Sequence, residues 1–392
     1  MTGGSVTRDG RDPLGVYVHV PFCRVHCPYC DFYTYPASRG REEEYGRALV
    51  REITLVERRL RPERFLVETI YFGGGTPSTL APARIREVIA RLGERLSISR
   101  EAEITLEANP EDVSAEMLEA WKEAGPNRIS IGVQTLAPES LAFLGRVHSS
   151  AAARRSLDLL STHPNWSADL MFGWEGQTVE QLEADLKAVL SCAPPHISLY
   201  QLTLEPKTRL GVLAARNLVR CADTDCQADL YLAACEILES AGLRQYEVSN
   251  FARPGFESRH NQAYWERRPY LGLGPSAASL INQRRTRNIA SLPRYIAALN
   301  AGGWPLASVE VLTPDQVATE RLWLGLRTAA GVELSSIPAG CEAMLAEARR
   351  QEFLLTGQSN RIILSRKGMA VADEFVQRLL PTVQRSNLEC ES

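Results

Sequence analysis

The chain has 392 residues, 44% of them hydrophobic and 23% charged, with a net charge of −3. This composition is ordinary for a globular protein with a buried core, and the small net charge gives no sign of a polyanionic partner, so we expect no nucleic-acid role. No run of 18 apolar residues occurs, and the first residues are polar and rich in glycine. We therefore expect neither a membrane span nor a secretory signal.

Six short apolar or β-branched runs recur in the first half of the chain. They are VYVHV (16–20), ETIYF (68–72), EITLEA (103–108), RISIGVQ (128–134), SADLMF (167–172) and HISLYQL (196–202). Between them, apolar residues at helical spacing predict helices over 41–60, 114–125 and 177–192. Strands and helices that alternate in this way form parallel βα units. We predict an α/β fold, a partial TIM-like barrel of six units, (βα)6.

The chain divides by composition into four segments. We expect residues 1–15 to be disordered and residues 16–245 to form the barrel. Residues 246–285 are rich in Gly, Pro and Arg, which predicts long ordered loops. Residues 286–392 carry mostly helical patterns and one expected strand over 361–365, which predicts a small C-terminal domain.

Residues suited to chemistry stand where the predicted strands end. A loop with three cysteines follows the first strand and GGGTP follows the second, while Glu107 and Asn109 end the third and Gln134 ends the fourth. Asp169 lies in the fifth strand. The carboxyl ends of the strands of a βα barrel share one mouth, so we expect these residues to converge although they are far apart in sequence.

The three clustered cysteines, Cys23, Cys27 and Cys30, predict a metal centre. Thiolates bind soft metals, and structural zinc sites require four protein ligands. Three thiols suit a cubane 4Fe–4S cluster in which one iron stays open for a chelating small molecule. Zinc remains an alternative, because His19, His26 or Asp31 could supply a fourth ligand.

The other cysteines are scattered, and we expect them to pack as small hydrophobic residues. They are Cys192, Cys221, Cys226, Cys235, Cys341 and Cys390. An odd, uneven set in a long chain without a signal favours a reducing compartment, so we expect a cytoplasmic protein.

GGGTP, from Gly73 to Pro77, follows a predicted strand directly. Glycines remove side chains where a ligand must approach the backbone, and they permit positive φ. A tight turn alone would explain a glycine run, but beside the cysteine loop the run indicates a ligand site.

The CxxxCxxC loop together with GGGTP resembles the radical S-adenosylmethionine (SAM) superfamily. The chain is most similar to the oxygen-independent coproporphyrinogen III oxidase group, and within it to the HemW-type heme chaperones. The stretches that carry the resemblance include VYVHVPFCRVHCPYCDF, ETIYFGGGTPS, ITLEANPE, NRISIGVQTL, LGRVHS, ADLMFG, YEVSNFA and RHNQAYW.

The resemblance implies roles for individual residues. Cys23, Cys27 and Cys30 would hold the cluster, whose open iron SAM would chelate. The residues expected to contact SAM are Tyr17, Tyr29, Gly74, Gly75, Thr76, Glu107, Gln134, Arg146 and Asp169. The chemistry of these residues agrees with SAM as the ligand, because a carboxylate can pair with its ammonium group and an arginine with its carboxylate. Ordinary ion pairs at strand ends are the alternative for Glu107, Arg146 and Asp169.

Two functions from different classes are implied by the resemblance. One is an oxidase that decarboxylates coproporphyrinogen III by radical chemistry. The other is a chaperone that carries heme to acceptor proteins. The oxidase type has a further cysteine two residues after the third, where this chain has Phe32. This departure favours the chaperone.

The HNQAYW stretch, residues 260–265, matches the HNxxYW signature of the HemW type. The resemblance implies that His260, Tyr264 and Trp265 contact heme. A neutral imidazole is a good axial ligand for heme iron, and the two aromatic rings offer flat apolar area to a porphyrin. A histidine bonded within a loop beside core aromatics is the alternative.

We therefore expect a heme chaperone that binds a 4Fe–4S cluster, SAM and heme and passes heme to respiratory heme proteins, with peripheral contact at the cytoplasmic face of the membrane. The chain also departs from its group at two places. Ala278 replaces a usual histidine, and Trp174-Glu175 replaces a usual Leu-Pro pair at the border of the mouth.

Overall fold

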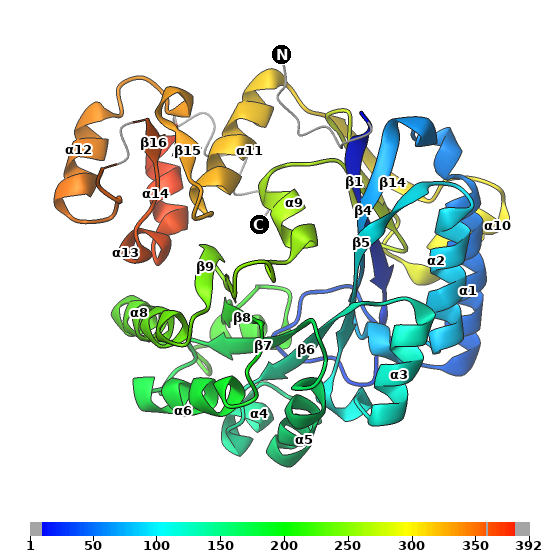
Figure 1. Ribbon diagram of the computed structural model, residues 1–392, viewed down its shortest axis with the longest axis horizontal. Helices are drawn as coiled ribbons and strands as arrows, with labels where there is room; N and C mark the ends of the chain where they lie inside the picture. Colours follow the sequence, from blue (N-terminus) through cyan, green and yellow to red (C-terminus); the bar gives the residue numbers. More distant parts are fainter. Residues whose placement is uncertain (1–9, 358–359, 381–392) are drawn as a thin grey trace.

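The computed structural model describes residues 10–357 and 360–380, and its main feature is a curved sheet of twelve strands (Figure 1). Six neighbouring strands are parallel and form the partial barrel that the sequence predicts. They are β1 (Asp12–Val20), β4 (Phe65–Gly74), β5 (Ser97–Ala108), β6 (Arg128–Gln134), β7 (Trp166–Phe172) and β8 (His196–Gln201). Two short strands, β2 (Phe22–Cys23) and β3 (Tyr35–Pro36), pair within the cysteine loop.

Further strands extend the barrel sheet at both edges. Beyond β8, β10 (Asn250–Ala252) and β9 (Arg244–Glu247) add antiparallel. Beyond β1, β11 (Tyr270–Leu273) pairs in parallel. The antiparallel strands β12 (Ala278–Ile281), β13 (Arg284–Asn288) and β14 (Leu306–Val311) follow it.

Helices cover the convex face of the sheet (Figure 1). Those that link the barrel strands are α1 (Arg39–Thr54), α2 (Pro82–Gly93), α3 (Ala115–Ala124), α4 (Pro138–Phe143), α5 (Ser150–Leu160) and α6 (Val179–Leu190). After the last barrel strand, β8, come α7 (Arg209–Ala214) and α8 (Thr224–Ser240), which lead to β9. The helix predicted over 114–125 is confirmed as α3, and its end residues act as caps: the Ser114 side chain accepts from the Met117 amide, and Gly125 follows the helix with a φ of 124°. In α6, Thr178 and Gln181 form a capping box.

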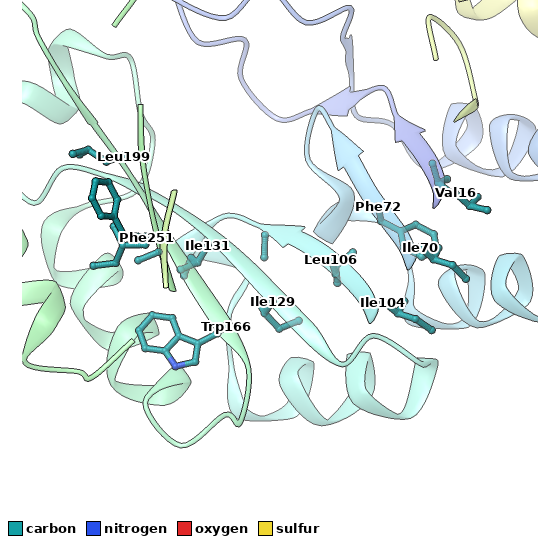
Figure 2. Close-up of a cluster of buried hydrophobic side chains, with 14 of the residues drawn as sticks. Val16, Ile70, Phe72, Ile104, Leu106, Ile129, Ile131, Trp166, Leu199 and Phe251 are labelled. Carbon is teal, nitrogen blue, oxygen red and sulfur yellow. The ribbon is translucent and has the colours of Figure 1, made fainter. Parts of the chain in front are cut away.

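The hydrophobic core lies between the sheet and these helices. Alternate strand residues such as Val16, Ile70, Leu106, Ile131 and Trp166 point to this layer and are at most 1% exposed (Figure 2). Alternation sends their neighbours along each strand to the concave side, where the sequence places polar residues. The convex face of the sheet therefore stabilises the fold by burying apolar side chains, and the concave face carries the polar side chains that can bind ligands.

One helix, α9 (Arg259–Trp265), lies on the concave side of the sheet (Figure 1). It carries the HNQAYW stretch. The Ser258 side chain caps it by accepting from the Asn261 amide. The Glu103 carboxylate on β5 accepts from the backbone amides of Arg259 and His260, each at 3.1 Å. An acidic group at a helix N-terminus is favourable, so β5 anchors α9 inside the barrel.

Two sequence expectations were wrong in part. Residues 12–15 belong to β1, so the expected disorder does not extend through them; residues 1–9 lie outside the described residues. Residues 246–285 are not mainly loops, because β10, α9, β11 and β12 form there. The division into domains stays a prediction, and β13 and β14, which lie at or after its boundary near residue 285, continue the main sheet.

The C-terminal part is mostly helical, as expected. After α10 (Leu292–Asn300) and β14 come α11 (Pro314–Leu326), α12 (Glu342–Arg350), α13 (Arg366–Met369) and α14 (Ala372–Leu379), with a small sheet of β15 (Val332–Glu333) and β16 (Arg361–Ile362). Its buried residues are continuous with the main core. No helix in the described part of the chain is long and apolar enough to cross a membrane. Cys390 lies outside the described residues.

A buried carboxylate, that of Glu52 on α1, ties the added strands to the barrel. It accepts from the Gly274 amide at 2.7 Å, the Asn288 side chain at 2.6 Å and the Tyr295 hydroxyl at 2.5 Å. Burial raises the pKa of Glu52 to about 7 despite these donors. The contacts join α1 to the turn after β11, to β13 and to α10.

We expect Glu52→Gln to flatten the dependence of stability on pH. A carboxyl whose pKa rises on folding stabilises the protein below its unfolded pKa of about 4.5, and this stabilisation is lost as pH rises through about 7. The loss amounts to at most about 3 kcal/mol of unfolding free energy between pH 5 and pH 8. Urea unfolding at both pH values measures it. Glu44→Gln, at an exposed position on the same helix, should keep the wild-type slope; an unchanged slope in Glu52→Gln would contradict the assignment.

Candidate functional site

The expected site residues converge at the carboxyl ends of the parallel strands. The cysteine loop follows β1, the glycine run ends β4, Glu107 is near the end of β5, and Gln134 ends β6. Pairing of β1 with β4 sets His19 opposite Gly73 and Val20 opposite Gly74. This register holds the glycine run beside the start of the cysteine loop.

Polar groups surround the cysteine loop. The Thr76 hydroxyl is 3.5 Å from Cys23 Sγ, and Arg146 Nη1 is 3.7 Å from Cys27 Sγ. The backbone also folds the loop on itself, because the Cys30 amide donates to the Cys27 carbonyl at 3.1 Å. A hydroxyl and a guanidinium directed at sulfur stabilise thiolates, which are the form that binds metal.

Burial raises the pKa of the Cys23 thiol, and raises that of Cys30 to about 11. Both are therefore neutral at pH 7 unless a metal takes the place of the proton. The donor set fits an iron–sulfur cluster, because soft thiolates are the usual ligands of such clusters.

The same residues fit a single zinc ion less well. Among residues 10–357 and 360–380, no three His, Cys, Asp or Glu side chains are arranged to hold one metal ion. In a cubane each thiolate binds a different iron, so the sulfurs need not meet at one point. His19, a candidate fourth zinc ligand, is buried, with Nδ1 3.1 Å from the Tyr17 hydroxyl and Nε2 3.3 Å from the Tyr33 carbonyl. His26 Nδ1 is 2.8 Å from the Thr34 hydroxyl.

The glycine run, Gly73 to Gly75, forms a narrow cradle, and side chains at these positions would collide with its walls. A Cβ on Gly75 would lie 2.6 Å from the Phe22 carbonyl oxygen and 3.0 Å from Cys23 Sγ. Gly74 has a φ of 113°, which L-residues rarely adopt. A Cβ on Gly73 would lie within 3.1 Å of three side chains, those of Tyr71, Tyr17 and Glu107. Glycine is thus required here by close packing as well as by the turn.

Two carboxylates face the concave side below the cradle. Glu107 accepts from the Tyr71 hydroxyl at 2.8 Å and from the Gly74 amide at 3.2 Å. Asp169 accepts from the Ser130 hydroxyl at 3.0 Å. The surrounding protein withdraws both from water, which raises the pKa of Glu107 to about 7 and that of Asp169 to about 6. A cationic ligand would offset this cost.

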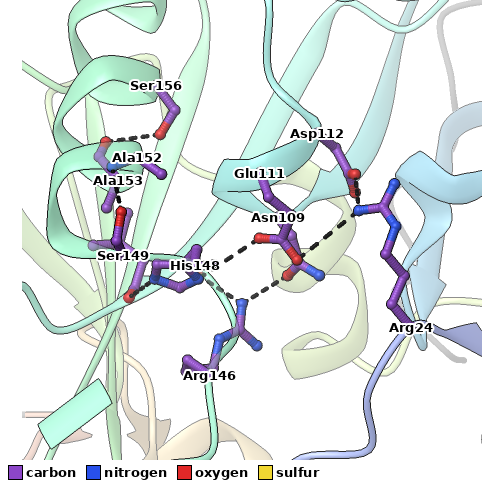
Figure 3. A network of polar contacts seen from close by, with 12 residues as sticks. Arg24, Asn109, Glu111, Asp112, Arg146, His148, Ser149, Ala152, Ala153 and Ser156 are labelled. Carbon is purple, nitrogen blue, oxygen red and sulfur yellow. Dashed lines mark hydrogen bonds and ion pairs between the residues drawn. The ribbon is translucent and has the colours of Figure 1, made fainter. Parts of the chain in front are cut away.

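A polar network connects β5, β6 and the cysteine loop (Figure 3). Arg146 donates to the Asn109 side chain at 2.7 Å and to the Gly132 carbonyl at 3.0 Å. Asn109 in turn donates to the Thr76 hydroxyl at 3.3 Å. Gln134, with a φ of 65°, lies close by, since a Cβ on Gly132 would lie 2.8 Å from its Nε2 and 3.4 Å from Arg146 Nη2.

The network has an outer part that positions these groups. Arg24 of the cysteine loop pairs with Asp112, and the buried His148 has Nδ1 3.7 Å from Glu111 Oε2 (Figure 3). His148 Nε2 donates to the Val133 carbonyl at 3.2 Å, and burial lowers the pKa of His148 to about 4, so it is neutral. Tyr29 is half-buried, and its hydroxyl interacts with Arg146.

The structure places His260 in the interior of the protein. Its ring is 2% exposed, with Nδ1 2.7 Å from the Thr69 hydroxyl and Nε2 3.1 Å from the Tyr264 hydroxyl. Burial lowers the pKa of His260 to about 3, so the imidazole is neutral. Trp265 ends α9 and is half-buried.

Tyr71 on β4 connects the two groups of predicted residues, although no motif in the sequence singled it out. Its hydroxyl binds Glu107, and its ring stacks on that of His260 with centroids 5.0 Å apart. On its other side the ring of Tyr17 lies 6.2 Å away, also stacked. The alternation of ETIYF does put Tyr71 and Thr69 on one face, but nothing local in the sequence shows that α9 packs against that face.

Comparison with known proteins agrees with this geometry. A model of the radical SAM superfamily matches residues 17–189. The heme chaperone HemW of Bacillus subtilis is 37% identical over 81% of this chain and 84% of its own, and that of Mycobacterium tuberculosis is 36% identical over 94% and 95%. The solved structure of coproporphyrinogen III oxidase (HemN) from Escherichia coli has a TM-score of 0.78, covering 93% of this chain and 89% of its own. At 22% identity, that likeness shows the fold alone.

We expect Gly75→Ala to reduce cluster assembly, because the added methyl group would displace Cys23 or the Phe22 backbone. Iron and acid-labile sulfide per chain, measured after anaerobic reconstitution, should fall at least about twofold. Gly40→Ala is the matched control, since a Cβ at Gly40 meets no atom within 4 Å. Equal iron content in both variants would show that the cradle does not position the thiols.

Proposed function

This chain belongs to the HemW family of the radical SAM superfamily, and from this premise we propose that it is a heme chaperone that binds a 4Fe–4S cluster, SAM and heme. The observation that carries the proposal is the position of α9. The helix with the HNQAYW signature lies inside the barrel, in contact through Tyr71 with the carboxylate suited to SAM.

Cys23, Cys27 and Cys30 would hold the cluster by three thiolates. A cluster held in this way supplies an iron with an exchangeable position and can deliver an electron to a bound ligand. Arg146 would stabilise negative charge at Cys27, and Thr76 would do so at Cys23. The Gly75 cradle keeps the backbone close to the sulfurs.

SAM would bind beside these groups with its cationic part toward the carboxylates. Glu107 is suited to accept from its ammonium group, and Asp169 adds a second negative charge on the same side. Gly74, Gly75 and Thr76 would present backbone to the methionine part, while Arg146 and Gln134 offer donors. Tyr17 and Tyr29 would supply aromatic contact area.

Heme would bind at the HNQAYW helix. A neutral imidazole is the form that ligates iron, and His260 is neutral because it is buried. Its Nε2 faces the Tyr264 hydroxyl, so ligation requires this contact to open. Tyr264 and Trp265 would then offer apolar area to the porphyrin. From this position heme would pass to respiratory heme proteins, in the cytoplasm or at its membrane face.

An oxidase is the second candidate function, because the fold is shared with HemN. The decisive experiment offers coproporphyrinogen III and SAM to the reduced, reconstituted protein and measures decarboxylated product. The chaperone proposal predicts no product and about one heme bound per chain, which an acceptor heme protein then takes up. Decarboxylated product at a catalytic rate would support the oxidase instead.

Glu107→Gln should weaken SAM binding by about tenfold at pH 8, or ~1.4 kcal/mol, because it removes a charge facing the ammonium. A cation binds the carboxylate form, so wild-type affinity should rise with pH up to about 7 and then level off. Above pH 6.5, where the wild-type affinity for SAM still rises, the affinity of Glu107→Gln should stay constant. Isothermal titration measures both, with Glu101→Gln, at an exposed position on β5, as control. Equal affinities at pH 8 would remove Glu107 from the SAM site.

Tyr264→Phe should bind heme at least as tightly as the wild type, because it frees His260 Nε2 from its hydroxyl partner. His260→Ala should shift the Soret band and weaken binding about tenfold or more. His163→Ala, at a histidine outside α9, serves as control. An unchanged spectrum and titration in His260→Ala would exclude this residue as the ligand. Thermal unfolding of each variant shows whether α9 keeps its place.

A further inference from the structure

A separate cavity of about 350 Å³ opens between the end of α1 and the strands β12 to β14. Its polar lining comes from the short helix after α1 and from the added part of the sheet: Arg58, Arg59, Ser279, Arg284, Thr286 and Trp304. None of the residues of the candidate site lines it. The volume lies in the range of small-ligand pockets.

The cavity is rich in positive charge that makes no direct ion pair within the described part of the chain. Arg58, Arg59 and Arg284 line it, and no Asp or Glu does. Within the described part of the chain, no carboxylate lies at ion-pair distance from any of the three arginines. Neighbouring Arg285, in contrast, pairs with Glu310 and Glu320.

Contacts with neighbouring side chains hold the Arg59 guanidinium in one position, as expected of a group that binds a ligand. Its guanidinium stacks on the Trp304 ring at 4.5 Å, and it donates to the hydroxyls of Thr286 and Ser279. Burial lowers the pKa of Arg59, and the positive charge of Arg284 lowers it further, while the buried Glu52 carboxylate opposes both effects in part. An anion in the cavity would relieve this repulsion.

A buried donor on one of the residues that line the cavity also lacks an acceptor. The indole Nε1 of Trp304 is shielded from water and makes no hydrogen bond in the structure. An unsatisfied buried N–H typically costs about 1–3 kcal/mol. The buried carboxylate of Glu52 acts electrostatically on Arg59, but its oxygens are already engaged by Gly274, Asn288 and Tyr295.

We propose that this cavity binds a compact oxyanion, with Arg59 and Arg284 as the charged donors and Arg58 at the rim. Guanidinium groups pair with phosphate and carboxylate oxygens in two-point contacts. The oxyanion has two sources, a phosphate group of a small molecule or the propionate carboxylates of a porphyrin. The site stands on its own residues and does not depend on the proposed heme function.

Isothermal titration with inorganic phosphate and, separately, with heme tests the site and distinguishes its sources. If the source is phosphate, the wild type binds phosphate saturably, and Arg59→Gln and Arg284→Gln each weaken this binding at least about fivefold. If the source is the porphyrin, the same variants weaken heme binding instead. Arg61→Gln, an equal change of charge just outside the cavity, should change either affinity less than twofold.

The proposal is overturned if phosphate does not saturate and heme affinity is the same in all variants, or if Arg61→Gln loses as much affinity as the cavity variants. Arg284 is exposed, so its substitution leaves the fold intact even if Arg59→Gln is destabilised. A lowered thermal unfolding midpoint would show that Arg59→Gln is destabilised, and the affinity of Arg284→Gln alone would then decide whether the cavity binds the anion.

Discussion

A pair of carboxylates inside the barrel, whose pKa values burial raises more than the nearby Arg128 lowers them, is the constraint on which the site depends. Glu107 and Asp169 stand on strands whose outward residues build the core, so alternation alone turns both carboxylates inward. There they are removed from bulk water, and their pKa values rise to about 7 and about 6. Such groups are costly to keep in a fold unless a cation binds them. SAM, with an ammonium and a sulfonium, is a ligand of the required charge.

Two neighbouring strands of the barrel, β4 and β5, also hold the HNQAYW helix. On β5, Glu103 anchors the N-terminus of α9 four residues before Glu107. On β4, Thr69 binds His260, and Tyr71 lies between His260 and Glu107. One layer of side chains therefore separates the proposed heme ligand from the proposed SAM site. Movement of the His260 ring would remove the packing partner of Tyr71, whose hydroxyl orients Glu107, so the two ligands are placed to influence each other.

Local patterns were enough to predict the barrel but not its additions. The six parallel strands and the capped helices follow from alternation and from Ser114 and Gly125, which act over a few residues. The pairing of β11 with β1 joins residues more than 250 positions apart, and four-residue strands among Gly and Pro have no clear period. The insertion of α9 was missed for the same reason. Resemblance supplied most of the site residues, whereas Tyr71 and the bridging role of Asn109 became visible only in three dimensions.

The structure shows where the three residues that depart from the family pattern, Trp174, Ala278 and Phe32, lie. Trp174 is 6% exposed and packs with Leu144, Met171 and Leu202, so it fills a small core at the border of the mouth. Ala278 begins β12, where its carbonyl lies so close to Gly272 that only glycine fits there. Phe32 is 56% exposed beside the cysteine loop. The backbone of Phe32 hydrogen-bonds to the Cys30 thiol, which lowers the pKa of that thiol and partly offsets the larger effect of burial.

Metal and sulfide analysis of anaerobically prepared protein is the most direct test of these ideas. Three thiolates with one open iron require about four irons and four acid-labile sulfides per chain, and no stoichiometric zinc. A single zinc without sulfide would contradict the cluster, and with it the assignment of the facing carboxylates to SAM.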